Sequence, residues 1–234
     1  MDTEYLIDIF ELESRSLDAM VRTHPSLRPL FTRSFRGVDL DALRRAYLGL
    51  LKISADVTRH TVPALRAAGL ALRAGDAADR KWSELFLGYA TDETDTGADY
   101  GHHVWARQDM AALGAPAELL DAPVQTSAVL YGKYFIEDAA RHPYAILGAK
   151  GVLEHAAIRT ADEIARAVVE SGIPHADQAT QFFHHHGVLD IEHVRDGDRN
   201  LQHLADPEQQ RQIVEGAYVT TGTYRALVHH LLPA

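Results

Sequence analysis

The sequence contains no cysteine among its 234 residues. This absence excludes disulfides, thiolate metal sites, iron–sulfur clusters and cysteine nucleophiles. Imidazole and carboxylate are then the only strong metal ligands that the chain can offer, and its 14 histidines make imidazole plentiful. If the protein binds a transition metal, we expect histidine, aspartate and glutamate to hold it.

Positive charge is also scarce, because 23 basic residues stand against 33 acidic ones and the formal net charge is −10. A nucleic acid or an anionic membrane requires a positive face, so neither is expected as a partner. The sequence has no apolar run long enough to span a bilayer and no basic start typical of a signal peptide. We expect a cytoplasmic protein that binds a small molecule, and the sequence leaves open whether it forms a homodimer.

The sequence lacks Pro/Gly/Ser-rich linkers and alternating apolar–polar strand patterns, which favours one all-α domain over residues 1–234. Apolar residues recur at intervals of three and four, as on one face of a helix. Asp39 or Asp41 is expected to cap the second helix, and Gly114 and Gly172 are expected to stop later ones. The pattern predicts a bundle of seven helices, over about residues 3–23, 39–75, 77–114, 123–141, 144–171, 175–204 and 206–232.

The most informative motif lies in the sixth predicted helix, where His186, Asp190 and His193 follow the spacing i, i+4, i+7. At about 100° per residue these side chains lie within about 60° of one another, on one helix face. An inward-facing aspartate between two imidazoles needs a partner, and a cation is the simplest one. The motif therefore predicts a metal site with open coordination positions.

Two other segments offer further ligands. Glu154 lies among apolar residues of the fifth predicted helix, and a glutamate is rarely buried without a partner. Lys150, one turn earlier, offers an alternative partner through an ordinary salt bridge. In the third predicted helix, Asp99 and His102 have the i, i+3 spacing that chelates from adjacent turns. His102 and His103 point about 100° apart, so one of them is expected to be the ligand.

Three blocks of this sequence resemble the heme-oxygenase-like di-iron oxidases, a superfamily of seven-helix bacterial metalloenzymes. The resemblance covers about residues 40–230. The first block begins at Gly101-His102 and ends at Leu113-Gly114, the second leads from His142-Pro143 to Glu154, and the third is the His186 motif. The family usually has a glutamate before the first histidine. This chain offers Asp99, Asp95 or Glu93 there, and Asp99 is the preferred candidate.

The resemblance implies a single seven-helix heme-oxygenase-like bundle that is an O2-dependent non-heme iron oxidase or oxygenase. It implies two Fe²⁺ per chain, with O2 as cosubstrate and an amino-acid-, amine- or fatty-acid-like substrate that undergoes N-oxygenation, desaturation or C–C cleavage. The donor set does not determine whether the site holds one metal ion or two, or whether the metal is iron or manganese. The implied metal ligands are Asp99, His102, Glu154, His186, Asp190 and His193.

Supporting roles are also expected around this site. Asp109, Glu192 and His155 are candidates to orient the ligands. The substrate pocket is expected between the ligand helices, with Tyr131, Tyr134, Phe135, Phe182 and Phe183 as candidate lining residues and Lys150, Arg159 or His60 as candidate partners of a substrate carboxylate.

Two other functions fit the same residues. A cofactor-independent oxidase of the quinone-cofactor-synthase type would use the histidines as acids and bases, and it would leave Glu154 and Asp190 without a clear purpose. A non-enzymatic metal-binding helical protein is the second alternative. It is less favoured, because the histidines lie inside predicted helices among apolar residues and not in a loose terminal tract.

Overall fold

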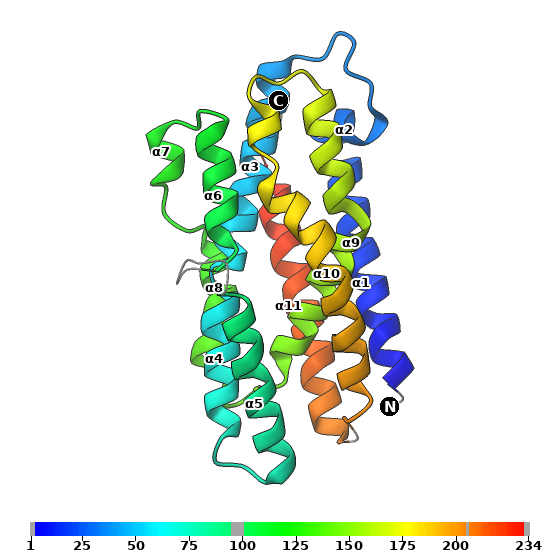
Figure 1. Cartoon of the computed structure of the whole chain (residues 1–234), viewed down its shortest axis with the longest axis vertical. Coiled ribbons are helices and arrows are strands. Elements are labelled where there is room, and N and C mark those ends of the chain that lie inside the picture. Colours follow the sequence, from blue (N-terminus) through cyan, green and yellow to red (C-terminus); the bar gives the residue numbers. More distant parts are fainter. Residues whose placement is uncertain (1–2, 95–100, 205, 232–234) are drawn as a thin grey trace.

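The protein folds into an elongated bundle of helices (Figure 1). The computed structural model describes residues 3–94, 101–204 and 206–231. Within these ranges no strand is found, so the all-α expectation is confirmed. The helical elements in chain order are α1 (Thr3–Thr23), α2 (Arg28–Thr32), α3 (Leu40–Thr58), α4 (Thr61–Leu72), α5 (Ala77–Asp92), α6 (His103–Ala112), α7 (Ala117–Leu120), α8 (Thr126–Gly132), η1 (Lys133–Glu137), α9 (Ala145–Glu170), η2 (Ala176–Gln178), α10 (Gln181–Leu201) and α11 (Pro207–His229).

The long helices begin and end close to where capping residues predict. Asp39 accepts hydrogen bonds from the backbone N–H groups of the first turn of α3, so it and not Asp41 is the cap. Asp206 caps α11 in the same way, with Pro207 at the first helical position. Gly114 and Gly172 have φ values of 68° and 82° and follow the ends of α6 and α9. Glycine adopts this left-handed conformation without strain, so both stops are confirmed.

The expectation of seven helices was wrong, because three predicted helices are interrupted and short ones are added. The second breaks at Arg59 and His60 into α3 and α4, before Pro63. The third is not continuous, since α5 ends at Asp92 and α6 begins at His103. The sixth begins with the 3₁₀ turn η2, and its α-helix, α10, starts only at Gln181. The short helices α2 and α7 are additions, and α8 continues as the π-helical segment η1.

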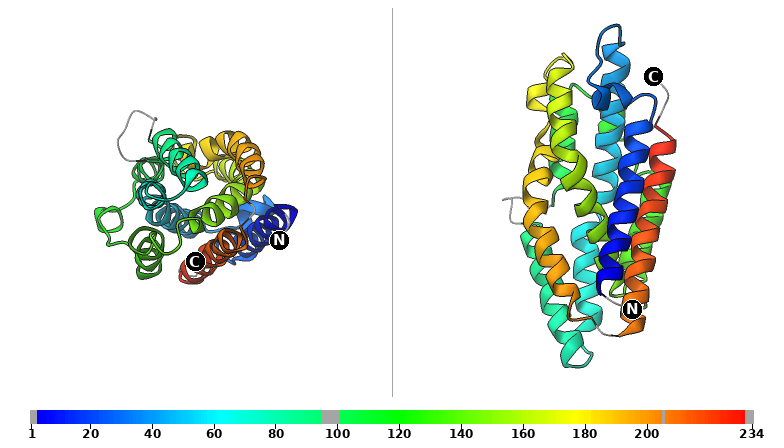
Figure 2. Two further views of the ribbon diagram at one scale, coloured as in Figure 1. Left: turned by 90° about the horizontal axis from the view of Figure 1, so that it is seen from below. Right: turned by 90° about the vertical axis from the view of Figure 1, so that its right-hand side faces the viewer.

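Helix α9 is the central element of the bundle and packs against α1, α10 and α11. The end-on view in Figure 2 places this yellow-green helix near the middle. Its contact with α11 is close because both helices have glycine there. A Cβ atom on Gly148 would lie 1.9 Å from the carbonyl oxygen of Ile213, and one on Gly216 would lie 1.9 Å from that of Ala145. The backbones touch at this crossing, which fixes the position of α9.

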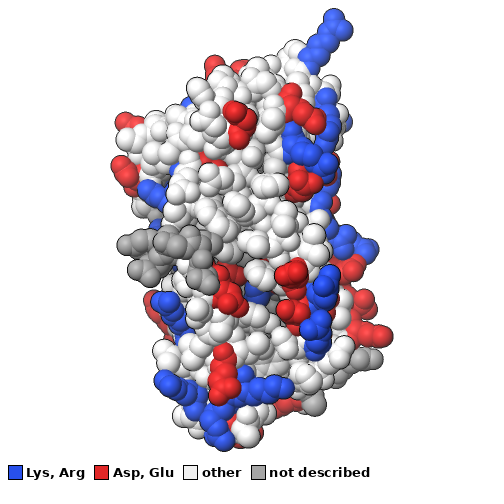
Figure 3. All heavy atoms as spheres, in the orientation of Figure 1, with Lys and Arg blue, Asp and Glu red and all other residues white. Residues whose placement is uncertain are grey.

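Acidic and basic side chains are interspersed on the face of the molecule shown in Figure 3. This face therefore carries no broad basic patch of the kind that binds nucleic acid. Within the described ranges, no helix has the length and apolarity needed to cross a bilayer.

Candidate metal centre

Seven ionisable side chains from four elements meet inside the bundle. Glu93 follows the last residue of α5, His102 precedes α6, Lys150 and Glu154 lie on α9, and α10 contributes a group of three. The group on α10 consists of His186, Asp190 and His193. Glu93, His102, Lys150, Glu154 and Asp190 are all buried. So many ionisable groups are buried together only where they can neutralise one another or bind ions.

One end of the cluster contains two imidazoles and a carboxylate. Nδ1 of His102 lies 3.2 Å from Nε2 of His186 and 3.2 Å from Oε2 of Glu93. The His102 ring stacks on Trp105, with ring centroids 4.4 Å apart. His102 and His186, which are far apart in sequence, are therefore held in contact, with Glu93 beside them.

Lys150 connects this end of the cluster to Glu154. Its Nζ atom lies 3.4 Å from Oε1 of Glu93 and makes a shorter contact with Oε1 of Glu154. The salt bridge between Lys150 and Glu154, which the sequence offered as an alternative to metal binding, is therefore present. Nζ also lies 4.9 Å from the centroid of the Tyr89 ring, close enough for a cation–π interaction.

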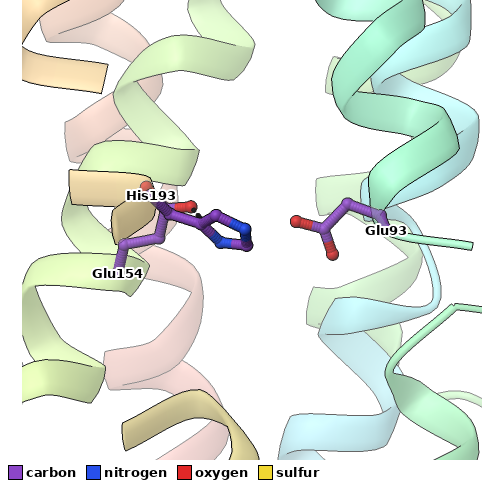
Figure 4. Close-up of side chains that lie close together, drawn as sticks. All are labelled: Glu93, Glu154 and His193. Carbon is purple, nitrogen blue, oxygen red and sulfur yellow. Dashed lines mark ion pairs between the residues drawn. The ribbon is translucent and has the colours of Figure 1, made fainter. Parts of the chain in front are cut away.

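The other end of the cluster is formed by α9 and α10. Nδ1 of His193 lies 3.3 Å from Oε1 of Glu154 and 3.3 Å from Oδ1 of Asp190. In Figure 4 the imidazole of His193 and the carboxylate of Glu93 point toward each other from opposite sides. Potential ligand atoms of Glu93, Glu154 and His193 all lie within 4.8 Å of one another. The contacts thus form one continuous chain from His186 to Asp190.

The electrostatics of the cluster differ between its two ends. Burial lowers the pKa values of His102 and His186, which favours neutral imidazoles with lone pairs. Hydrogen bonds to Asp190 and Glu154 raise the pKa of His193 to about 10. Burial acts against the charge of Lys150, but Glu154 and Glu93 outweigh it and raise the pKa of its ammonium group. Burial opposes the charge of Glu93 in the same way, and Lys150 lowers the pKa of this carboxyl group nonetheless.

Local backbone features aim the histidines into the cluster. Gly101 has a φ of 71°, and this left-handed residue turns the chain so that His102 enters just ahead of α6. On α10, Nδ1 of His186 lies 2.7 Å from the carbonyl oxygen of Phe182, one turn earlier. A proton on Nδ1 that is donated to this carbonyl leaves the Nε2 lone pair facing the cluster. This is the tautomer that a metal requires.

Asp109 fixes the start of α10 from another helix. This fully buried side chain on α6 accepts hydrogen bonds from the backbone N–H groups of Gln181, at 3.1 Å, and Phe182, at 2.8 Å. Thr180, at the N-cap position, makes no side-chain capping bond, so Asp109 supplies the missing acceptor. Burial raises the pKa of Asp109 to about 6. Asp109 therefore holds the helix that carries the His186 motif.

Five of the six predicted ligands lie together in this cluster, and the sixth lies outside the described residues. The five are His102, Glu154, His186, Asp190 and His193. Asp99, the preferred first carboxylate, and Asp95 both fall within residues 95–100, outside the described ranges. Glu93, the third candidate, is the carboxylate that lies beside His102. His102 contacts the cluster, and His103 is not part of its described contacts.

The residues that were expected to support the ligands or to bind a substrate carboxylate differ in where they lie relative to the cluster. His155 lies 3.5 Å from Asp198, and Glu192 is exposed. Of the candidate carboxylate partners, Lys150 is paired within the cluster and Arg159 lies 3.3 Å from Glu11. Sequence reasoning did not assign roles to Tyr89 and Trp105, which cover Lys150 and His102. The i, i+3 spacing from His102 to Trp105 was the available signal for the second contact.

Comparison with known proteins identifies the family. Residues 57–224 match the family described as iron-containing redox enzymes. The chain belongs to this family. No curated protein matches the chain.

Two solved structures resemble this member of the iron-containing redox enzyme family in fold. A domain of unknown function with a heme oxygenase-like fold, from Shewanella denitrificans OS217, is 15% identical with a TM-score of 0.74, over 99% of this chain and 92% of that one. A CADD-like protein of unknown function from Nostoc punctiforme PCC 73102 is 16% identical with a TM-score of 0.53, over 95% of this chain and 96% of that one. The fold is therefore heme oxygenase-like.

The residues of the cluster fit the iron that the family description implies. Three carboxylates and three imidazoles form a donor set suited to first-row divalent metals. The hydrogen bond from His186 to the Phe182 carbonyl leaves a lone pair on Nε2, which contacts His102 here and which a metal ion would take as a ligand. Glu93, Glu154 and His193 are close enough to share one ion.

Proposed function

We propose that this protein is a non-heme di-iron oxidoreductase that uses O2 to oxidise a small molecule. The convergence of six carboxylate and imidazole side chains in a buried position is the observation that carries the proposal. Glu93, His102, Glu154, His186, Asp190 and His193 would hold the metal. Bound ferrous iron would supply the electrons that reduce O2.

The residues around the site would prepare the ligands and control their protons. The Phe182 carbonyl orients His186, and Asp109 holds the first turn of α10, which includes Phe182. His193 carries a proton on Nδ1 between Asp190 and Glu154. Because its pKa is raised, His193 must release a second proton from Nε2 before this nitrogen can act as a ligand.

A cavity of about 140 Å³ adjoins the cluster and is the proposed substrate site. Its wall includes the site residues Glu93, His102, Glu154, His186 and Asp190, so a bound molecule would lie directly against the metal ligands. Apolar side chains make up most of the remaining wall, among them Leu17, Leu50, Ile146, Leu153, Phe182 and Phe183. Of the expected lining residues, Tyr131, Phe182 and Phe183 are present, whereas Tyr134 and Phe135 are not.

The wall of this cavity restricts the substrate. An engineered apolar cavity of about 150 Å³ in another protein binds one benzene ring, so a cavity of this size admits an apolar group of about that bulk. Among the residues that the structure describes, the wall includes no arginine, and its lysine, Lys150, is paired with Glu93 and Glu154. An anionic group on the body of the substrate would lie there without a cationic partner. These features favour an amine or acid with an apolar body over a strongly polar amino acid.

One observation favours a cofactor-independent oxidase as the second candidate. Lys150 already pairs with Glu93 and Glu154, so these carboxylates have a partner without a metal. In such an enzyme His102 and His186, which contact each other, would act as acids and bases, and Asp190 would remain without a clear purpose. A non-enzymatic metal-binding protein would have no need of the adjoining apolar cavity.

Anaerobic loading with Fe(II) tests the proposal. The metal-free protein is loaded, the bound iron is counted, and O2 is admitted while the visible spectrum is followed. Bound iron with a transient O2-dependent band is the expected result, and His186→Ala and Glu154→Ala should each abolish the band. His184→Ala is the matched control, because His184 is exposed on the same helix and its loss should leave the band unchanged.

Absence of tightly bound iron and of any O2-dependent band would exclude the di-iron assignment. Oxidation of a substrate by such an iron-free protein would then favour the cofactor-independent oxidase. Bound iron that does not react with O2, even with candidate substrates, would favour a metal-binding protein without enzymatic activity.

A further inference from the structure

Lys150 lies inside the proposed metal centre, although it is not a metal ligand of the usual kind. Its side chain is 7% exposed, and its ammonium group contacts the carboxylates of Glu93 and Glu154. These two carboxylates come from opposite sides of the cluster, from the end of α5 and from the middle of α9. The positive charge is therefore held between two proposed ligands.

We propose that the Lys150 ammonium group competes with the second of two metal ions, so that the first ion binds much more tightly than the second. This inference rests on the proposed function, because it concerns the occupancy of the same site. It makes Lys150 a positioning residue that sets metal occupancy and does not contact the reacting atoms.

The charges of the cluster limit how many divalent ions it can balance. Among the residues that the structure describes, Glu93, Glu154 and Asp190 bring three negative charges, Lys150 brings one positive charge, and imidazoles that act as ligands are neutral. These groups have a net charge of −2, which one divalent ion balances. A second divalent ion would leave two uncompensated positive charges in a buried site, and burial of unbalanced charge is strongly unfavourable. Without Lys150, two divalent ions would leave only one uncompensated positive charge.

The position of Lys150 adds direct competition to this charge effect. One oxygen of Glu154 contacts the ammonium group. This oxygen can bind a metal ion only if the contact with the ammonium group is lost. Oε1 of Glu154 also faces His193, at 3.3 Å, so the same oxygen is shared with another proposed ligand. The face of the Tyr89 ring lies 4.9 Å from Nζ and further stabilises the ammonium group where it is.

Stepwise metal titration tests the inference. Mn(II) is used as the probe, because it needs no protection from O2 and the free ion can be counted by electron paramagnetic resonance. For the wild-type protein we expect one tight ion and a second ion bound at least about 10-fold more weakly. Lys150→Met removes the charge and keeps a long apolar side chain. It should tighten the second ion about 10-fold or more relative to the first.

Two matched variants control for other effects. Lys150→Arg keeps the positive charge and should retain the wild-type ratio of the two binding constants. Lys81→Met removes the same charge from an exposed position on α5 and should also leave the ratio unchanged. If Lys150→Met fails to fold, as judged by circular dichroism, Lys150→Gln takes its place.

The outcomes separate this inference from the proposed function. Two ions with equal constants in the wild-type protein would overturn the inference and leave the metal centre intact. The same would follow if the ratio in Lys150→Met matched that in Lys81→Met. Failure of the wild-type protein to bind Mn(II) or anaerobic Fe(II) at all would overturn both the inference and the proposed function.

Discussion

Asp109 holds the start of α10, and we predict that its replacement by Asn changes the way in which stability depends on pH. The side chain is fully buried, and its carboxylate accepts two backbone N–H groups from the first turn of that helix. Burial raises its pKa from 3.8 to about 6, against the opposing effect of the two hydrogen bonds. Protonation of Asp109 is therefore easier in the folded protein than in the unfolded chain.

The sign and size of the effect follow from this shift. Because the folded pKa lies above the unfolded one, the stabilisation linked to Asp109 is fully present below about pH 4 and is lost as the pH rises through about 6. The complete shift corresponds to about 3 kcal/mol of unfolding free energy. Between pH 5 and pH 7.5, the unfolding free energy linked to Asp109 falls by about 1.4 kcal/mol. For a chain of this length, that amounts to about 3–6 °C in Tm.

The assay compares thermal unfolding of the metal-free wild-type and Asp109→Asn proteins at pH 5 and pH 7.5, followed by circular dichroism. Other groups titrate equally in both proteins, so the difference between their Tm values isolates Asp109. We expect the wild-type advantage to be larger at pH 5 than at pH 7.5 by about 3–6 °C. Asp177→Asn is the control, since this carboxylate on η2 is exposed. The same wild-type advantage at both pH values, or a smaller one at pH 5, would refute the reasoning.

Three further predictions concern the ligands and the packing. Glu93→Gln should lower the Fe(II) bound per chain in an anaerobic titration, whereas Asp99→Asn should leave it unchanged; the reverse result would assign the first carboxylate to Asp99. Gly216→Ala should lower the unfolding free energy by about 3 kcal/mol or more, because its Cβ would lie 1.9 Å from a backbone carbonyl of α9. Gly222→Ala, which meets nothing within 4 Å on the same helix, should raise it by up to about 1 kcal/mol in the same denaturant titration. Metal binding should quench the fluorescence of Trp105, which stacks on the imidazole ahead of α6; a Trp105→Phe protein that shows the same quenching would contradict this.

The helices that the sequence predicted well are those whose ends are fixed by nearby residues. Asp206 with Pro207 starts α11, and Gly172 ends α9, so these boundaries depend on interactions within a few residues. The break between α3 and α4 at Arg59 and His60 has no such local signal beyond Pro63. The apolar spacing continues across it, because both helices pack on the same core. Periodicity detects the buried face but not a change in helix direction.

The part of the site on α9 and α10 could be predicted because each helix is continuous through its ligands. His186, Asp190 and His193 lie within α10, so helical geometry alone places them on neighbouring turns. The role of Lys150 could not be decided in this way. Its spacing from Glu154 predicts a salt bridge, and that contact is present. The second contact, to Glu93, depends on how α5 packs beside α9, which no local pattern contains.

The first carboxylate illustrates why one helix break changes a site prediction. The preference for Asp99 assumed a continuous helix from 77 to 114, in which Asp99 and His102 share a face. Helix α5 instead ends at Asp92, and α6 begins at His103, so the helical phase is not carried from one segment to the other. Glu93 and His102 lie on either side of this break, so no helical spacing could predict their contact, whereas Asp99 lies outside the described residues and its role stays a prediction. Glu93 lies beside His102 because α5 stops just before Glu93 and α6 starts after His102 at the same point in the bundle.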